Sequence, residues 1–230
     1  RLEQSSAEHK LIVTDGVFSM DGNLAPLREI SRLAEKHSAW LMVDDAHGVG
    51  VLGQQGGGLV EELNMTVEQV PVLVGTLGKS FGTFGAFVAG SEALIETLIQ
   101  FSRSYIYTTA LPPAIAAATL ASLKIVREES WRRDRLVQLV ARFRRGAQQI
   151  GLQLAESNTP IQPVLINNDE KVMQVGQQLR AAGFLVGAIR PPTVPVGTGR
   201  LRITFSANHS EEQVDQLVAA LDSLNLSAAV

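Results

Sequence analysis

Short apolar runs alternate with segments of helical periodicity along most of this chain, and this alternation limits its possible folds more than any other feature. In the first half, the runs with the length of a strand cover 10–15, 40–43, 70–76 and 84–89. Between them, residues 26–38 and 91–101 place apolar side chains at helical spacing. Strands that alternate with helices predict an α/β fold, with a mostly parallel sheet flanked by helices.

The second half of the chain has a different order of elements. Long helical patterns come first, at 114–129 and 131–150. The segments that follow are predicted as strand 161–166, helix 170–182, strands 184–189 and 200–205, and helix 211–224. We therefore predict two domains. Residues 1–128, which include a connecting helix, form part of a larger domain, and residues 129–230 form a smaller α+β domain.

The composition excludes several classes of function. Lys and Arg number 20 against 23 for Asp and Glu, which gives a net charge of −3 and no electrostatic case for nucleic acid or an anionic membrane as a partner. No apolar run is long enough to span a bilayer. The absence of cysteine excludes disulfides and thiolate sites and fits a reducing compartment. We expect a cytoplasmic protein.

Polar residues follow two neighbouring strands at the edge where α/β sheets bind ligands. Asp44, Asp45 and His47 follow the second run, and Lys79 follows the third in a tight loop after Thr76. Two carboxylates and an imidazole can bind a metal, but the remaining histidines are isolated, so no metal site is predicted. The alternatives are that the carboxylate and imidazole face an organic cofactor, or that Asp45 only caps a turn.

Three motifs near this edge are incomplete matches to known sites. Gly48–Gly53 matches G-x-G-x-x-G, but residues 54–58 are a poor helix start, so a flexible loop is favoured over dinucleotide binding. Gly78–Ser80 matches the end of a P-loop, but Leu73 stands where that motif needs glycine. Ser19 lacks the glycines of a nucleophile elbow, which makes a serine hydrolase a poor explanation.

Arg190 comes at the end of a predicted strand and leads into a proline-rich loop. A guanidinium can hold a carboxylate through two parallel hydrogen bonds. From this residue alone, a carboxylate-binding arginine and an ordinary surface arginine both remain open.

Five sequence strings, taken together and in order, resemble the α-oxoamine synthases, a family of fold-type-I pyridoxal-phosphate enzymes. The strings are Asp15–Gly22 (DGVFSMDG), Val43–Gly48 (VDDAHG), Thr76–Lys79 (TLGK), Tyr107–Pro113 (YTTALPP) and Ala188–Arg202 (AIRPPTVPVGTGRLR). They span essentially the whole chain. The resemblance implies that the first half is part of the large domain of that fold.

The same resemblance implies pyridoxal 5'-phosphate as the cofactor and assigns residues to it. Lys79 would bind the cofactor covalently and move the α-proton of the amino acid, with His47 as the other catalytic residue. Asp44 would pair with the pyridinium nitrogen and keep the ring protonated. His47 and Ser19 would bond near the phenolic oxygen, and Thr76 would contact the phosphate.

The resemblance also implies partners and substrates. Thr108 or Thr109 would reach the phosphate of a neighbouring subunit in a homodimer, and Arg190 with Thr193 would hold the substrate carboxylate. The string at residues 188–202 is most like the family member that serves biotin biosynthesis, an acyltransferase that condenses L-alanine with pimeloyl-CoA or pimeloyl carrier protein. The alternative is a sister enzyme that uses glycine or serine with another acyl-CoA.

Members of this family carry a substantial segment before the strand that begins here at Lys10. That segment supplies an aromatic residue stacked on the cofactor ring and a glycine-rich helix start for its phosphate. We therefore expect these 230 residues to be a piece of a longer protein. A truncated, non-catalytic remnant that only dimerises is the remaining alternative.

Overall fold

Residues 2–226 are described in the computed structural model of this protein. Their contacts divide the chain into two units, one made of Arg1–Val17 and Leu24–Ser130, the other of Phe18–Asn23 and Trp131–Val230. The short segment Phe18–Asn23 thus belongs to the second unit, although the chain on both sides of it belongs to the first. The sequence patterns give no sign of this exchange.

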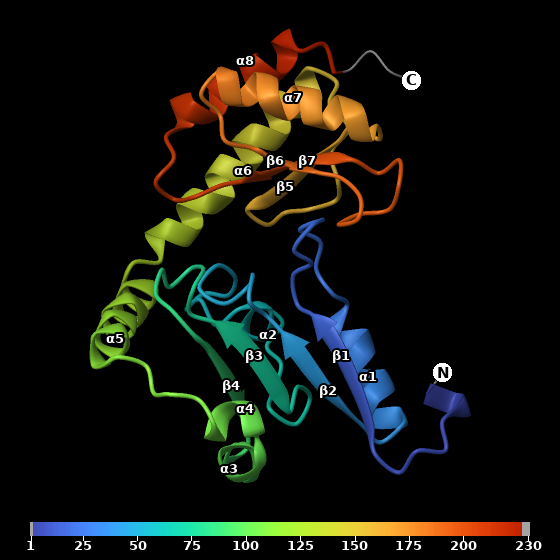
Figure 1. The fold of residues 1–230 in the computed structure, drawn as a ribbon, viewed down its shortest axis with the longest axis vertical. Helices are drawn as coiled ribbons and strands as arrows, with labels where there is room; N and C mark the ends of the chain where they lie inside the picture. The colour runs from blue at the N-terminus through green and yellow to red at the C-terminus, as the bar shows by residue number, and fades with distance from the viewer. Residues whose placement is uncertain (1, 227–230) are drawn as a thin grey trace. The chain divides into compact units, whose positions relative to one another are not determined.

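The first unit is built on a four-stranded sheet with the order β1-β2-β3-β4 (Figure 1). The strands are β1 (Lys10–Asp15), β2 (Ala39–Asp44), β3 (Val72–Thr76) and β4 (Ala86–Gly90). The first three are parallel, and β4 runs antiparallel to β3. The predicted α/β class with a mostly parallel sheet is confirmed. The connection from β3 to β4 is too short for a crossover helix, so β4 can only return antiparallel.

The helices of the first unit follow the predicted order, with two short additions. They are α1 (Leu27–Lys36), α2 (Leu59–Glu62), α3 (Glu92–Phe101), α4 (Arg103–Ile106) and α5 (Pro113–Glu128), after a 3-10 turn at Leu2–Gln4. The side chain of Ser91 accepts a hydrogen bond from the Leu94 N–H at 3.3 Å and so caps the N-terminus of α3. The four-residue helices α2 and α4 were not predicted, because one helical turn leaves no periodicity to detect.

The second unit packs three helices with a three-stranded antiparallel sheet of order β5-β7-β6 (Figure 1). Its elements are α6 (Trp131–Gln149), β5 (Ile161–Leu165), α7 (Asp169–Ala181), β6 (Gly187–Ile189), β7 (Arg200–Thr204) and α8 (Glu211–Ser223). All three helices contribute fully buried side chains to one core, among them Phe143, Val172 and Leu221. This confirms an α+β arrangement in the second half of the chain.

The predicted strand 184–189 is wrong in its first half, since β6 begins only at Gly187. Gly183 has φ +91°, and the Phe184 N–H bonds to the Leu179 carbonyl at 2.8 Å. The residues after α7 therefore complete the end of that helix before the chain can pair with β7. A hydrophobic run cannot distinguish these two uses of the backbone.

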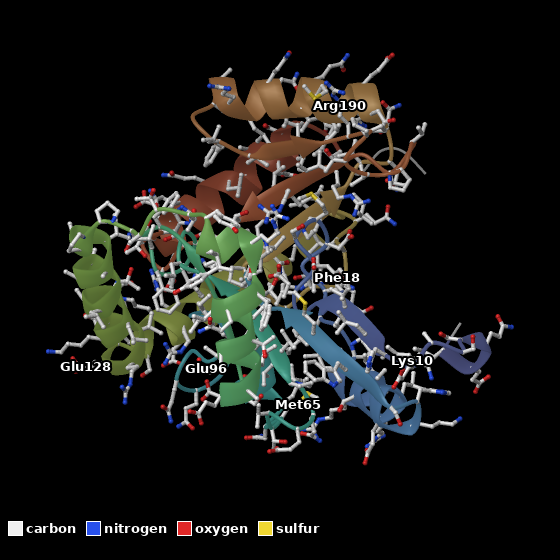
Figure 2. The ribbon with its side chains drawn as sticks, turned by 60° about the horizontal axis from the view of Figure 1, so that its bottom comes forward. Lys10, Phe18, Met65, Glu96, Glu128 and Arg190 are labelled. Carbon is white, nitrogen blue, oxygen red and sulfur yellow. The ribbon has the colours of Figure 1, made fainter. Side chains whose placement is uncertain are left out.

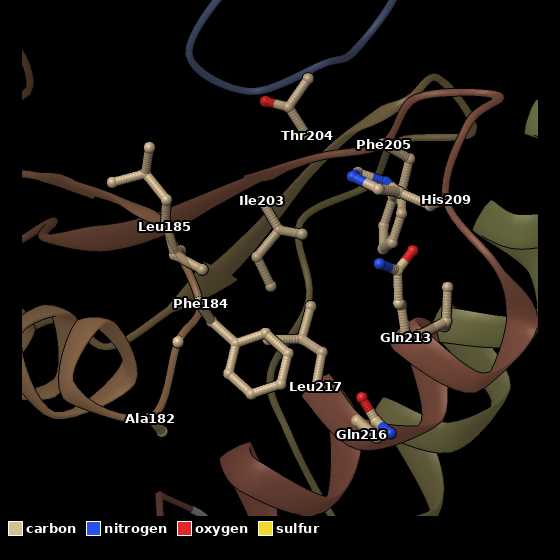
Figure 3. Close-up of a pocket in the computed structure, with 13 residues that line it drawn as sticks. Ala182, Phe184, Leu185, Ile203, Thr204, Phe205, His209, Gln213, Gln216 and Leu217 are labelled. Carbon is tan, nitrogen blue, oxygen red and sulfur yellow. The ribbon is translucent and has the colours of Figure 1, made fainter.

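A pocket of about 380 Å³ lies within the second unit, between the segment before β6, the end of β7 and α8 (Figure 3). Phe184, Ile203 and Leu217 give it an apolar lining, and His209 and Gln213 are among its polar side chains. None of the residues predicted to bind cofactor or substrate lines this pocket.

Candidate active site

Four residues predicted from the sequence lie at or just after the ends of β2 and β3, namely Asp44, His47, Thr76 and Lys79. Asp44 is the last residue of β2 and lies beside Asp15, the last residue of β1, in the parallel register. His47 follows in the next loop, and Lys79 lies in the turn after β3. The Nζ atom of Lys79 is 3.1 Å from Nε2 of His47. The fold thus joins an amine and an imidazole that are 32 positions apart in the chain.

Asp15 connects this pair electrostatically to Asp44. The pKa of Asp15 is raised above its usual value, first by partial burial and then by the negative charge of Asp44, whereas the positive charge of Lys79 acts in the opposite direction. The carboxyl of Asp15 therefore lies within electrostatic range of both Asp44 and Lys79, two residues that were predicted from the sequence. Asp15 itself was quoted in the sequence only as part of a string, and its place as the last residue of the first strand was the signal that could have marked it.

Hydrogen bonds hold the turn that carries Lys79. The hydroxyl of Thr76 accepts from the Gly78 N–H at 3.3 Å, and the hydroxyl of Ser80 donates to the Val49 carbonyl at 2.6 Å. The side chain of Lys79 is exposed, so its amine is accessible to a ligand. The predicted contact of Thr76 with a phosphate stays a prediction, since the bonds of its hydroxyl in the structure serve the turn.

Asp45 is completely buried, with no exposed surface. Its Oδ2 accepts a hydrogen bond from the Leu59 N–H at 2.6 Å, at the first residue of α2. Burial raises the pKa of Asp45 to about 6, the charge of Asp44 adds to the rise, and the N–H groups of Leu59 and Gly48 oppose it. The sequence left open whether Asp45 only caps a turn. In the structure its carboxylate caps the short helix α2 instead.

The raised pKa of Asp45 predicts a pH-dependent stability. Between its ordinary value of 3.8 and about 6, the folded protein binds more protons than the unfolded chain, so the free energy of unfolding falls as pH rises through this range. Two pKa units correspond to about 3 kcal/mol. Between pH 4 and pH 7, the free energy of unfolding of Asp45→Asn, measured by urea denaturation, should rise by about that much relative to that of the wild type. A difference that does not change with pH would contradict the prediction.

The G-x-G-x-x-G match lies in a loop with many turns. Gly50, Gly53, Gly56 and Gly58 all have positive φ values between 80° and 87°, a region that glycine adopts without strain. No helix begins at Gly53, and the next one is the single turn α2. The structure therefore lacks the helix N-terminus that dinucleotide binding at this motif would need.

The predicted residues of the second unit include Ser19, which lies in the segment Phe18–Asn23. The guanidinium of Arg202 donates from Nε to the Ser19 carbonyl at 2.6 Å. Asp21 forms an ion pair with Arg200, whose side chain is only 10% exposed. Two arginines of β7 thus contact the residues on both sides of Met20, one at the Ser19 backbone and the other at the Asp21 side chain.

Breaking the Asp21–Arg200 pair leaves a nearly buried guanidinium without its counter-ion. We expect Asp21→Asn to lower the free energy of unfolding by about 1–2 kcal/mol in urea denaturation, because Asp21 itself is half-exposed. Asp215→Asn is the matched control, since it removes a carboxylate that pairs with the more exposed Arg142. An equal loss in both variants would show that burial of Arg200 adds nothing.

Arg190, labelled in Figure 2, lies on an exposed turn after β6. The Thr193 N–H donates to the Arg190 carbonyl at 3.1 Å, so the two predicted carboxylate-binding residues belong to one turn. Thr108 and Thr109 are exposed between α4 and α5 of the first unit. The roles of all four residues stay predictions.

Two further features bear on the classes of site. Within residues 2–226, no group of three or more His, Asp or Glu side chains is placed to hold a metal ion. In the same part of the chain, no helix is both long enough and apolar enough to cross a membrane.

The first unit therefore presents a nucleophilic amine, an imidazole and a carboxylate at one sheet edge. This donor set fits an organic cofactor with a carbonyl group and a cationic ring. The carbonyl can react with the amine of Lys79, and the ring nitrogen can pair with Asp44.

Comparisons with known proteins agree with this chemistry. Residues 1–221 match the family described as Aminotransferase class I and II. A 221-residue stretch is 60% identical to the 8-amino-7-oxononanoate synthase of Pseudomonas paraeruginosa, covering 96% of this chain and 55% of the relative. This chain spans about half the length of the curated relatives it matches.

Solved structures give the same picture. A serine palmitoyltransferase from S. paucimobilis with a bound adduct of PLP and myriocin superposes with a TM-score of 0.91 at 32% identity, covering 97% of this chain and 56% of that one. The 8-amino-7-oxononanoate synthase of Francisella tularensis has a TM-score of 0.83 at 32% identity, covering 96% and 64%. The fold-type-I architecture is thereby confirmed.

Proposed function

The chain belongs to the class I and II aminotransferase family, and from this membership we propose that the full protein is an 8-amino-7-oxononanoate synthase of biotin biosynthesis. The reaction joins the α-carbon of L-alanine to the pimeloyl carbonyl of a thioester. It releases carbon dioxide and the thiol of coenzyme A or of a carrier protein. The high identity to synthases of this name supports the choice within the family.

The observation that carries this proposal is the contact of the Lys79 amine with the His47 imidazole, at the sheet edge where Asp44 ends β2. Bound pyridoxal phosphate supplies an aldehyde for the amine and a ring that withdraws electrons from the α-carbon of the amino acid. Lys79 removes the proton from that carbon. Asp44 holds a proton on the ring nitrogen, and His47 orients the ring beside the amine.

Other residues bind and orient the cofactor and substrate. Ser19 contacts the phenolic oxygen and Thr76 the phosphate. Arg190 and Thr193 hold the substrate carboxylate from one exposed turn. These roles rest on the match of each residue to the strings of the family.

The assembly we propose is a homodimer of the full protein in the cytoplasm, with small molecules as substrates. Thr108 and Thr109 are exposed in the first unit, which leaves their hydroxyls accessible to a second copy. There they would contact the phosphate in the neighbouring site.

A sister synthase that uses serine or glycine is the second candidate. The serine palmitoyltransferase structure favours it, because its TM-score of 0.91 exceeds the 0.83 of the Francisella synthase. Backbone similarity does not identify a substrate, however, and sequence identity is 60% to the Pseudomonas synthase against 32% to the serine palmitoyltransferase.

A substrate panel tests the proposal. The full-length protein is incubated with pyridoxal phosphate, with L-alanine, glycine or L-serine, and with pimeloyl-CoA or palmitoyl-CoA, and products are identified by mass spectrometry. We expect 8-amino-7-oxononanoate from L-alanine and pimeloyl-CoA. A product formed only from glycine or serine would favour the sister enzyme. The absence of any product would favour a non-catalytic protein.

A further inference from the structure

Asp45 is a buried titratable residue to which the proposed chemistry gives no task. It has no exposed surface, and its Oδ1 has no hydrogen-bond partner of normal geometry among residues 2–226. A carboxylate in this state lowers stability at neutral pH, as its raised pKa indicates. A residue that makes the fold less stable needs another reason for its place beside Asp44.

Three glycines from separate parts of the chain enclose this carboxylate. They are Gly16 at the end of β1, Gly48 in the loop after β2, and Gly58 just before α2. A Cβ atom added to these glycines would lie 2.5, 2.1 and 2.0 Å, respectively, from an oxygen of Asp45. The carboxylate thus occupies space that side chains at these positions would need. This packing accounts for Gly48, the first glycine of the G-x-G-x-x-G match.

The loop fixed in this way contacts the Lys79 turn at two points. The Val49 N–H donates to the Asp45 carbonyl at 3.0 Å, and the Val49 carbonyl accepts from the Ser80 hydroxyl at 2.6 Å. His47, two residues after Asp45, contacts the Lys79 amine at 3.1 Å. A displacement of this loop would therefore move both Val49 and His47, the two residues that contact the Lys79 turn.

We propose that Asp45 is a positioning residue for Lys79, because its carboxylate packs among Gly16, Gly48 and Gly58 and fixes the loop that places His47 and Val49 against the Lys79 turn. The proposal rests on the proposed function only in taking Lys79 as the reactive amine. Its structural part concerns the protein without cofactor.

Asparagine at position 45 tests the hydrogen bonding of the Asp45 carboxylate separately from the volume of its side chain. It has nearly the shape of aspartate but only one acceptor oxygen. If that oxygen keeps the bond from the Leu59 N–H, the amide nitrogen takes the place of Oδ1 beside the backbone of Gly48. The Gly48 N–H, whose interaction favours the carboxylate, then has an amide donor beside it, and we expect the loop to shift. Gly48→Ala keeps aspartate at position 45 but places a Cβ atom 2.1 Å from its Oδ1, so the carboxylate and the loop must move apart.

The test compares the full-length wild type with Asp45→Asn, Gly48→Ala and the control Leu41→Ala. Leu41 is fully buried in β2, so its truncation lowers global stability without touching the carboxylate. Amide hydrogen exchange is followed by mass spectrometry in cofactor-free protein, and pyridoxal phosphate affinity by absorbance titration. In both loop variants we expect exchange in 77–83 to be about tenfold faster and affinity about tenfold lower, the usual scale for residues that orient a binding group. Leu41→Ala should instead speed exchange throughout the first unit.

The outcomes separate the inference from the proposed function. Unchanged exchange in 77–83 in Asp45→Asn would overturn the positioning role, as would a variant that binds pyridoxal phosphate as tightly as the wild type. If the wild type itself does not bind pyridoxal phosphate, the proposed function fails. Exchange in 77–83 then decides alone whether Asp45 positions Lys79.

Discussion

Replacing Lys79 with alanine should lower the kcat of the full-length protein by at least about 10³-fold, the scale expected when a proton-transfer group is lost. The same amine is proposed to bind the cofactor covalently, so the visible absorbance of protein-bound pyridoxal phosphate should disappear with it. Product formation by mass spectrometry and an absorbance spectrum measure the two effects. Lys79→Arg should not restore activity, because a guanidinium stays protonated.

Lys36→Ala is the matched control for Lys79→Ala. Lys36 is also an exposed lysine of the first unit, where it pairs with Glu3 at 3.6 Å. Its removal should leave both kcat and the absorbance band unchanged. A Lys79→Ala protein with activity within tenfold of the wild type would remove the chemical basis of the proposed function.

Replacing Gly22 with alanine should destabilise the second unit by about 3 kcal/mol or more. Gly22 has φ +70°, a conformation that costs L-residues about 1–2 kcal/mol. The new Cβ atom would also lie 2.4 Å from the Ile161 carbonyl oxygen and from the Ser157 hydroxyl. Ser157 and Thr159 both donate hydrogen bonds to the Gly22 carbonyl, at 3.0 and 3.1 Å, and a shift of the loop would weaken them.

Gly197→Ala separates the two contributions, because Gly197 has φ +77° but no atom within 4 Å of an added Cβ. It should show only the conformational cost of about 1–2 kcal/mol. Urea denaturation of both variants measures the difference. Equal losses at the two positions would show that the loop 18–23 is not tightly packed in the second unit.

Much of the fold could be predicted because its elements are long enough to show their periodicity. The strand at 10–15 was predicted with the bounds that the structure has, and the predicted helix 91–101 differs from α3 by one residue. The short helix α2 and the shortened β6 were not predicted correctly. Their boundaries depend on hydrogen bonds with other segments, such as the one from the Leu59 N–H to the Asp45 carboxylate.

The candidate site was predicted in part. Asp44, His47 and Lys79 were selected because they follow neighbouring strands, and the structure places His47 beside Lys79. Asp15 and the packing around Asp45 were missed, because their significance depends on burial and on neighbours distant in sequence. No local pattern separates a solvated carboxylate from one enclosed by three glycines.

The sequence by itself determined the α/β class, the order of the main elements and the family resemblance, because periodicity and contiguous strings are local properties of the chain. Only the tertiary structure decided that the Lys79 amine meets the His47 imidazole, that the carboxylate of Asp45 lies buried among glycines, and that the segment 18–23 packs with the second unit. The physical reason is that burial, clashes and hydrogen bonds between distant residues arise from how the whole chain packs, and a linear pattern does not contain that packing.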